Sequence, residues 1–137
     1  MTRWLLVLCF VSTAEFAAAQ THSDVVTKFV DAFNARSIDA MLALATDDVE
    51  WVNVDGTKLT LETAGKTALR ASMTSYFKNC PTCRSEIQIL GATETRVTAI
   101  ETASWQAASG ARSQRSVSIY ELQNGAIRRV YYFPVEK

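Results

Sequence analysis

Histidine, proline and glycine are scarce in this chain, and their scarcity excludes several kinds of protein. The sequence contains one His, two Pro and five Gly. The only histidine, His22, is expected close to the N-terminus of the mature chain, where chains fray. Ser–His and Cys–His nucleophile pairs are therefore not predicted. The sequence also lacks a Gly- or Pro-rich linker, a low-complexity tract and an internal repeat, so a single domain is predicted.

An excess of charge of one sign is also absent. Fourteen basic residues balance fourteen acidic residues, giving a formal net charge of zero. No basic stripe is present, which argues against nucleic acid as a partner. After the leader described below, no segment has the roughly 20 consecutive apolar residues that span a bilayer, so we expect no membrane association of the mature chain. No cofactor is expected.

Residues 1–19 have the pattern of a secretory signal peptide. Arg3 provides the positive start, residues 4–11 are mostly apolar, and Ala17-Ala18-Ala19 provides an Ala-x-Ala site before Gln20. The apolar run is too short to cross a bilayer, which disfavours the alternative of an uncleaved anchor. We therefore predict cleavage near Ala19, a mature domain over residues 20–137, and a secreted or periplasmic location.

Cysteine is rare as well, and only Cys80 and Cys83 follow the predicted cleavage site. Their Cys-x-x-Cys spacing occurs in redox-active dithiols, where a helix N-terminus lowers the pKa of the first thiol. Here the pair is expected after a helix C-terminus, where the helix dipole has the wrong sign. We favour a structural disulfide over redox catalysis. Two Cys without a nearby His are half of a zinc site, so no metal site is predicted.

The apolar periodicity predicts three helices in the first part of the mature chain. Ser23 is expected to cap the first helix, and Asp47-Asp48 is interpreted as the turn that ends the second. Asp55-Gly56 is a strong hairpin signal. The predicted helices cover residues 21–36, 37–45 and 65–78, and a hairpin over residues 49–54 and 58–62 separates the second helix from the third.

From Arg84 onward no helical period is present, and a strand pattern replaces it. Gly110 and Asn124-Gly125 mark the last two turns between the predicted strands. Helices followed by an antiparallel meander indicate an α+β fold, with the helices on one face of the sheet. The predicted strands cover residues 84–94, 96–107, 114–123 and 126–135.

The strand predicted over residues 96–107 carries a single acid on its apolar face. A lone carboxylate on such a face must find a partner, take up a proton or face a cavity. Glu101 is therefore the candidate catalytic residue. The residues that alternation places on its face are Val97, Ala99, Ala103 and Trp105.

This layout, together with FVDAFNARSIDAMLALATDDVEWV and NGAIRRVYYFP, resembles the nuclear transport factor 2-like superfamily. Within it the chain is most similar to the SnoaL-like branch, which is related to polyketide cyclases and ketosteroid isomerases. The resemblance covers Ser23 to Pro134. It implies a cone, in which a strongly curved antiparallel sheet wraps three helices and leaves a mostly apolar pocket. Because this superfold hosts many functions, the resemblance specifies no activity.

The resemblance also indicates where the isomerase relatives hold their catalytic groups. Their tyrosine acid corresponds to Phe29, their aspartate base to Asn53, and their second acid to Val117, give or take one residue. Phe donates no hydrogen bond, Asn takes up no proton near neutral pH, and Val can do neither. Proton abstraction by that route is therefore not expected.

The predicted pocket combines Glu101 with other residues that should point inward. Arg115 is expected beside Glu101 if Arg115, Val117 and Ile119 face the interior. Two interpretations stay open: a pocket carboxylate tuned by arginine, or a buried structural ion pair. Aromatic residues in such a cone serve as core more often than as ligand contacts. The predicted ligand-binding residues are Phe29, Trp51, Asn53, Trp105, Arg115, Val117 and Tyr132.

Three functions remain open from the sequence. The favoured one is a domain that binds a small, largely apolar molecule without catalysis. The second is a lyase- or isomerase-type enzyme that uses Glu101 as acid or base, and the third is a dimeric interaction module whose cone is filled. A homodimer through the outer sheet face is expected, with solvent exposure as the alternative. That face is predicted to carry Thr98, Ile100, Thr102, Ser116, Ser118 and Tyr120.

Overall fold

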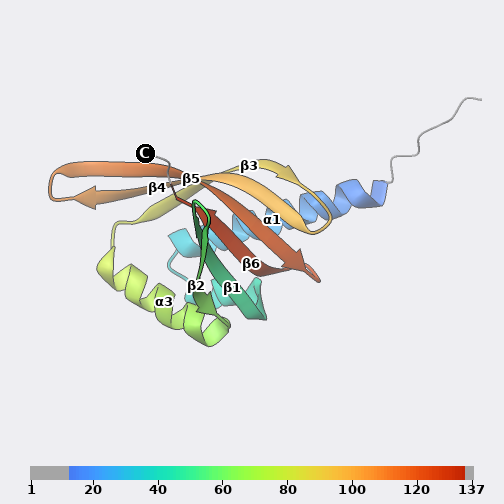
Figure 1. The fold of residues 1–137 in the computed structure, drawn as a ribbon, viewed down its shortest axis with the longest axis horizontal. Helices are drawn as coiled ribbons and strands as arrows, with labels where there is room; N and C mark the ends of the chain where they lie inside the picture. Colours follow the sequence, from blue (N-terminus) through green and yellow to red (C-terminus); the bar gives the residue numbers. More distant parts are fainter. Residues whose placement is uncertain (1–12, 135–137) are drawn as a thin grey trace, which may run out of the picture.

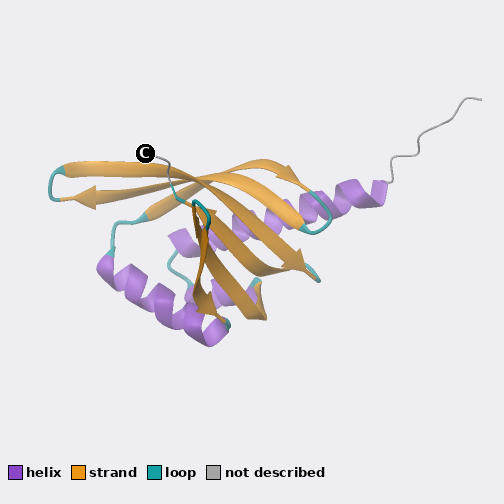
Figure 2. Ribbon diagram, in the orientation of Figure 1, coloured by secondary structure: helices purple, strands orange, loops and turns teal. Residues whose placement is uncertain are grey.

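The computed structural model describes residues 13–134, and its elements follow the predicted order (Figures 1 and 2). Helix α1 lies along one face of the sheet, and α3 lies beside β1 and β2, so the predicted α+β class is confirmed. The elements are α1 (Thr13–Asn34), α2 (Ile38–Ala43), β1 (Ala45–Asp55), β2 (Lys58–Ala64), α3 (Lys66–Asn79), β3 (Arg84–Ala92), β4 (Arg96–Ala107), β5 (Gly110–Gln123) and β6 (Ala126–Phe133).

The six strands form one curved sheet in the order β2-β1-β6-β5-β4-β3. Neighbouring strands are antiparallel except β1 and β6, which run parallel. The sheet is therefore mixed, where a purely antiparallel sheet was predicted. The β1–β2 hairpin joins the meander through its last strand, β6, and β1 and β6 run in the same direction. The helices cover the inner face of this sheet (Figure 2).

Tight turns set the strand register. Asn124 and Gly125 have φ values of 51° and 76°, the left-handed backbone of the hairpin turn predicted for this pair. The β4–β5 hairpin closes with Ala107 opposite Gly110. This register places Ser116 opposite Glu101 and decides which residues of β5 face the helices.

Helix α1 begins earlier than predicted. It starts at Thr13 instead of residue 21 and runs through the predicted cleavage site. Ser23 is inside the helix, where its hydroxyl donates a hydrogen bond to the carbonyl of Ala19 at 3.1 Å instead of capping a first turn. The Ala-rich residues 17–19 have high helix propensity, which accounts for the extension of the helix.

The Asp47-Asp48 pair does not form the predicted turn. Helix α2 ends at Ala43, and both acids lie in β1. Each is instead paired with a basic side chain, Asp47 with Lys66 at 3.0 Å and Asp48 with Arg128 at 3.2 Å. These contacts connect β1 to the start of α3 and to β6.

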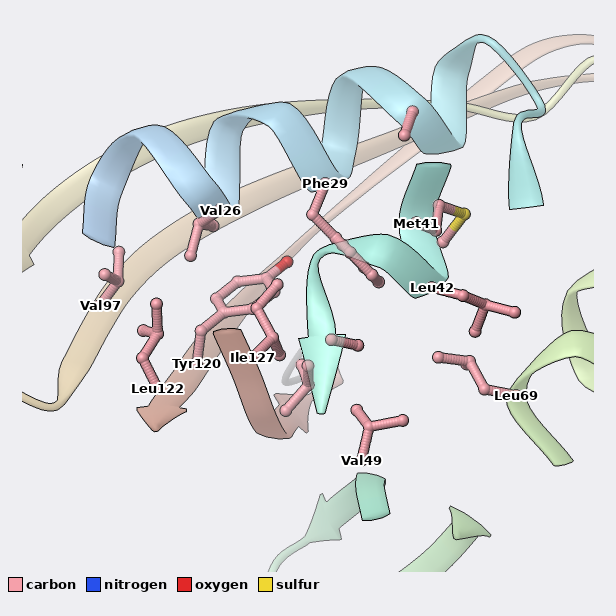
Figure 3. Packing of buried hydrophobic residues seen from close by; sticks show 13 residues of the cluster. Val26, Phe29, Met41, Leu42, Val49, Leu69, Val97, Tyr120, Leu122 and Ile127 are labelled. Atoms are coloured by element: carbon pink, nitrogen blue, oxygen red, sulfur yellow. The ribbon is translucent and has the colours of Figure 1, made fainter. Parts of the chain in front are cut away.

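The hydrophobic core fills one part of the space between the helices and the sheet (Figure 3). Val26 of α1, Val97 of β4 and Ile127 of β6 are fully buried there. Met41 of α2 and Leu69 of α3 close the core on the other side. None of the helices within residues 13–134 has the length and apolar character needed to cross a membrane.

A disulfide closes the turn between α3 and β3. The Sγ atoms of Cys80 and Cys83 are 1.96 Å apart. Arg36, just after α1, donates hydrogen bonds to the carbonyls of Cys80 (3.4 Å), Pro81 (2.5 Å) and Cys83 (3.2 Å). Its guanidinium also lies 4.9 Å from the ring centroid of Phe77. The end of α1 is thereby fixed to the disulfide turn.

Candidate functional site

A cavity of about 340 Å³ lies between the helices and the inner face of the sheet. It is at the lower end of the range for small-molecule pockets. Aromatic side chains line the cavity but leave it open, unlike the filled cone considered from the sequence. Its apolar wall is formed by Phe29, Val30, Phe33, Met41, Leu69 and Met73.

Glu101 lies in the cavity wall and is hydrogen-bonded by two hydroxyl groups. The Ser85 Oγ donates to its Oε1 at 2.5 Å, and the Tyr120 hydroxyl donates to its Oε2 at 3.4 Å. Burial raises the pKa of the Glu101 carboxyl above its usual value, while these two hydrogen bonds lower it in part. Within residues 13–134, no basic side chain forms an ion pair with Glu101.

Ser85 is held in place by the end of α1. The Asn34 side-chain amide donates to the Ser85 carbonyl at 2.7 Å, and the Ser85 backbone N–H donates to Asn34 Oδ1 at 2.9 Å. The Arg84 guanidinium donates to the backbone carbonyl of Asn34. Two residues before Ser85, Cys83 belongs to the disulfide turn. The hydroxyl that contacts Glu101 therefore has a rigid support.

Phenol groups add to the polar part of the cavity. Tyr120 is 1% exposed, and its ring packs in the core beside Phe29 (Figure 3). Burial and the nearby Glu101 carboxyl raise the pKa of Tyr120 well above its ordinary value. Burial, Tyr132 and Glu101 likewise raise the pKa of Tyr76. A carboxyl and three phenols thus surround one hollow.

A second polar group lies where β1 and β2 meet the cavity. The Asn53 Nδ2 donates to Glu62 Oε1 at 3.0 Å, and both residues line the cavity. Thr63 is buried beside them, and its Oγ1 has no hydrogen-bond partner among the described residues. The rings of Trp51 and Tyr132 lie nearby, with centroids 6.3 Å apart. Asn53, an amide that needs a partner on an inward face, finds it in Glu62.

The structure brings most of the predicted site residues together. Phe29, Trp51, Asn53, Glu101 and Tyr132 all line the cavity. The cavity is also lined by five residues that were not predicted as site residues: Glu62, Tyr76, Ser85, Gln114 and Tyr120.

Arg115 and Val117 lie on the opposite face of the sheet, so their predicted inward position is wrong. Because Ser116 is opposite Glu101, the inward residues of β5 are Ser116, Ser118 and Tyr120. Arg115 is exposed, and Val117 is 37% exposed. The Glu101–Arg115 ion pair is therefore absent. The position carried over from the second acid of the isomerases is also misplaced, since Val117 is not at the cavity.

Trp105 shares the inward face of β4 with Glu101 but does not line the cavity. It lies opposite Arg112, close to the turn of a hairpin that extends beyond the rest of the sheet (Figure 1). The pattern assigned its face correctly but could not show that the helices end before this point.

The outer face of the sheet carries a row of charges paired across four strands. Arg129 of β6 contacts Glu50 of β1 at 2.5 Å and Glu121 of β5 at 3.4 Å, and Glu121 contacts Arg96 of β4 at 3.3 Å. Beside this charge row, apolar side chains reach solvent. These include Leu59 (65% exposed), Leu61 (54% exposed) and Val117. The outer face is thus less polar than predicted.

The comparisons with known proteins agree with this architecture. The model of the SnoaL-like domain family matches residues 26–130. Among curated proteins, none matches the chain.

Solved structures with the same fold come from several bacteria. A candidate polyketide cyclase from Xanthomonas campestris is 21% identical, with 86% of this chain and 93% of that chain covered and a TM-score of 0.67. A cystatin-fold protein from Novosphingobium aromaticivorans is 20% identical (81% and 96% covered, TM-score 0.70). An NTF2-like protein from Burkholderia pseudomallei is 16% identical (84% and 92% covered, TM-score 0.69). At these identities the likeness concerns the fold alone.

Proposed function

Because the chain belongs to the SnoaL-like family of the nuclear transport factor 2-like superfamily, we propose that it binds a small, largely apolar molecule. The observation that carries this proposal is the open cavity of about 340 Å³, with an apolar body and a polar group at its wall. Such a combination is typical of pockets in which apolar contacts provide affinity and a few polar groups orient the ligand.

The proposal includes the absence of isomerase-type proton transfer. Phe29 and Asn53, which correspond to the acid and base of the isomerase relatives, both line the cavity. Neither side chain can do that proton chemistry near neutral pH, and Asn53 is already hydrogen-bonded to Glu62. Binding without this reaction is therefore the function that the lining residues favour.

The test is a thermal-shift screen of small aromatic and alicyclic compounds, repeated on a blocked variant. Ala103→Trp puts an indole on the inward face of β4, where Ala103 lines the cavity. Thr102→Trp puts the same group on the outward face one residue away. A hit should raise the melting temperature of the wild type and of Thr102→Trp, because a ligand that binds only the folded state stabilises it. Ala103→Trp should fold and show no shift. Equal shifts in both variants would place binding outside the cavity and contradict the proposal.

A lyase- or isomerase-type enzyme is the second candidate, and one contact favours it. The Glu101 carboxyl and the Tyr120 hydroxyl lie together in the cavity wall, so an acid or base is available there. With a compound found by the screen, Glu101→Gln should retain binding and lose turnover if this candidate is correct. Unchanged turnover would exclude Glu101 as the acid or base.

We also propose a homodimer through the outer sheet face. Its exposed apolar residues Leu59, Leu61 and Val117 are the kind that an interface covers. Sedimentation velocity of the wild type should give a dimer, and Val117→Lys should give a folded monomer. A monomeric wild type at high concentration would contradict this proposal.

Export is proposed from the leader pattern, and the Cys80–Cys83 disulfide is compatible with an oxidising compartment. Expression of the full chain in a bacterium should yield periplasmic or secreted protein whose intact mass corresponds to a start at Gln20. Recovery of the uncut chain from the cytoplasm alone would contradict it.

A further inference from the structure

The charge of the cavity wall specifies the kind of ligand more closely. We infer that the cavity takes a primary amine carrying an apolar, aromatic body, bound as its ammonium ion with Glu101 as the counter-ion. This inference rests on the proposed small-molecule binding and adds the chemical class of the ligand.

The first argument is the sign of the charge on the lining. The charged residues among the described lining are Glu62, Arg84 and Glu101. Arg84 is an exposed residue whose guanidinium donates to the Asn34 backbone carbonyl. Two carboxylates are thus offset by one guanidinium that is already engaged with the backbone. An anionic ligand would be repelled here, and a cation would be attracted.

The second argument is the hydrogen bonding of Glu101. Its partners are the hydroxyls of Ser85 and Tyr120, which carry no charge. A carboxylate has about four lone-pair sites, so each oxygen keeps a further acceptor site. Burying a carboxylate without a counter-ion is costly, and a cationic ligand would supply the missing charge. An alcohol donates a single hydrogen bond, whereas an ammonium group donates three and also neutralises the carboxylate.

The third argument is the aromatic wall around this carboxyl. Phe33 and Tyr76 lie with ring centroids 5.7 Å apart, and Trp51 and Tyr132 form a second pair. All four line the cavity. Aromatic faces attract ammonium groups and also accommodate an apolar body, so one ligand can use both features. A buried carboxylate and aromatic rings in one hollow therefore complement an arylalkylamine.

Three probes of nearly equal size separate the possible charges. Phenethylamine, phenethyl alcohol and phenylacetate share a phenyl ring and differ in the polar end. Calorimetric titration near neutral pH should show phenethylamine binding at least about tenfold more tightly than phenethyl alcohol, about 1.4 kcal/mol, with phenylacetate weakest.

Two variants test the role of the carboxyl. Glu101→Gln keeps the size of the side chain and should remove the preference for phenethylamine while leaving the affinity for phenethyl alcohol nearly unchanged. Glu86→Gln is the control, because Glu86 is an exposed acid that faces outward on β3 opposite Thr102. It should leave all three affinities unchanged. Circular dichroism of both variants shows whether they are folded.

The outcomes distinguish the inference from the proposed function. If phenethyl alcohol or phenylacetate binds as tightly as phenethylamine in the wild type, the amine class is wrong while small-molecule binding stands. If Glu101→Gln keeps the preference for phenethylamine, the assigned counter-ion is wrong. If none of the three probes binds and the wider screen also finds no ligand, the proposed function itself fails.

Discussion

Carboxylates on the two faces of the sheet have different partners. On the outer face, Glu50 and Glu121 lie in a row with Arg96 and Arg129, and each acid has at least one guanidinium within 4 Å. On the inner face, Glu101 has two hydroxyl partners and no ion pair among the described residues.

This contrast distinguishes carboxylates that are paired within the chain from one that can pair with a ligand. Ion pairs on a partly solvated face are satisfied within the chain and contribute little to stability. A carboxyl that is enclosed beside a cavity and hydrogen-bonded by hydroxyls has no counter-ion among the described residues, so a ligand can supply one. Four experiments can test this difference between the faces, and their expected effects decrease from the inner face to the outer one.

Truncating a tyrosine on each face should give the largest difference. Tyr120 on the inner face is 1% exposed, so Tyr120→Ala should cost about 3–5 kcal/mol of unfolding free energy. Tyr131 on the outer face is half-buried, with its hydroxyl accepting from Arg129 at 3.2 Å, and Tyr131→Ala should cost about 1 kcal/mol. Urea unfolding monitored by circular dichroism measures both. Equal losses would show that the faces are packed alike.

Removing the disulfide, which supports Ser85 on the inner face, should give the second-largest loss of unfolding free energy. The double variant Cys80→Ser/Cys83→Ser should lose about 2 kcal/mol, as expected for a cross-link that closes a very short loop. Reducing the wild type should give the same loss. A variant as stable as the oxidised wild type would mean that Arg36 and Asn34 alone hold the turn and Ser85 in place.

The pH dependence of stability should identify the inner carboxyl. The folded state raises the pKa of Glu101 above its ordinary 4.5, so ionisation is harder in the folded than in the unfolded chain. The stability contributed by protonated Glu101 is full below the unfolded pKa and is lost as pH rises through the folded pKa. Wild type should therefore lose stability relative to Glu101→Gln between acid and neutral pH.

Thermal unfolding of wild type and Glu101→Gln in a series of buffers measures this slope. A difference in stability between the two proteins that stays constant with pH would contradict the prediction, because it would mean that Glu101 titrates alike in the folded and unfolded chains. A difference of opposite sign would place a cation beside Glu101.

Breaking the outer charge row should have the smallest effect. Glu121→Gln removes the acid that contacts both Arg96 and Arg129. Because these side chains are partly exposed, the loss should stay below about 1 kcal/mol. It should shrink further in high salt, which screens surface charges. A larger, salt-independent loss in urea unfolding would show that the row is as enclosed as the cavity.

Local patterns were sufficient to predict most elements of the fold. The strand Arg96–Ala107 has the predicted bounds, and Asn124-Gly125 forms the predicted turn. The turn predicted at Asp47-Asp48 was wrong because these acids pair with Lys66 and Arg128, which lie far along the chain. Pairing of β1 with β6 is equally remote in sequence, and no periodicity reports it.

The site was predicted only in part because polarity misled the assignment of faces on β5. Val117 is apolar yet outward, while Ser116 and Ser118 are polar yet buried. The turn predicted at Gly110 is sufficient to assign the two faces of β5. A two-residue hairpin with Ala107 opposite Gly110 also sets Ser116 opposite Glu101, so counting residues back from the turn would have placed the faces correctly.

The parallel pairing of β1 and β6 has a consequence for biosynthesis. β6 (Ala126–Phe133) is the last strand of the sheet along the sequence, yet it occupies a central position between β1 and β5. The β1–β2 hairpin, translated early, has no hydrogen-bonded link to the meander until β6 leaves the ribosome. The complete sheet can therefore form only after β6 has been synthesised, and a chain cut short before Ala126 would expose the free edges of β1 and β5, which invite aggregation.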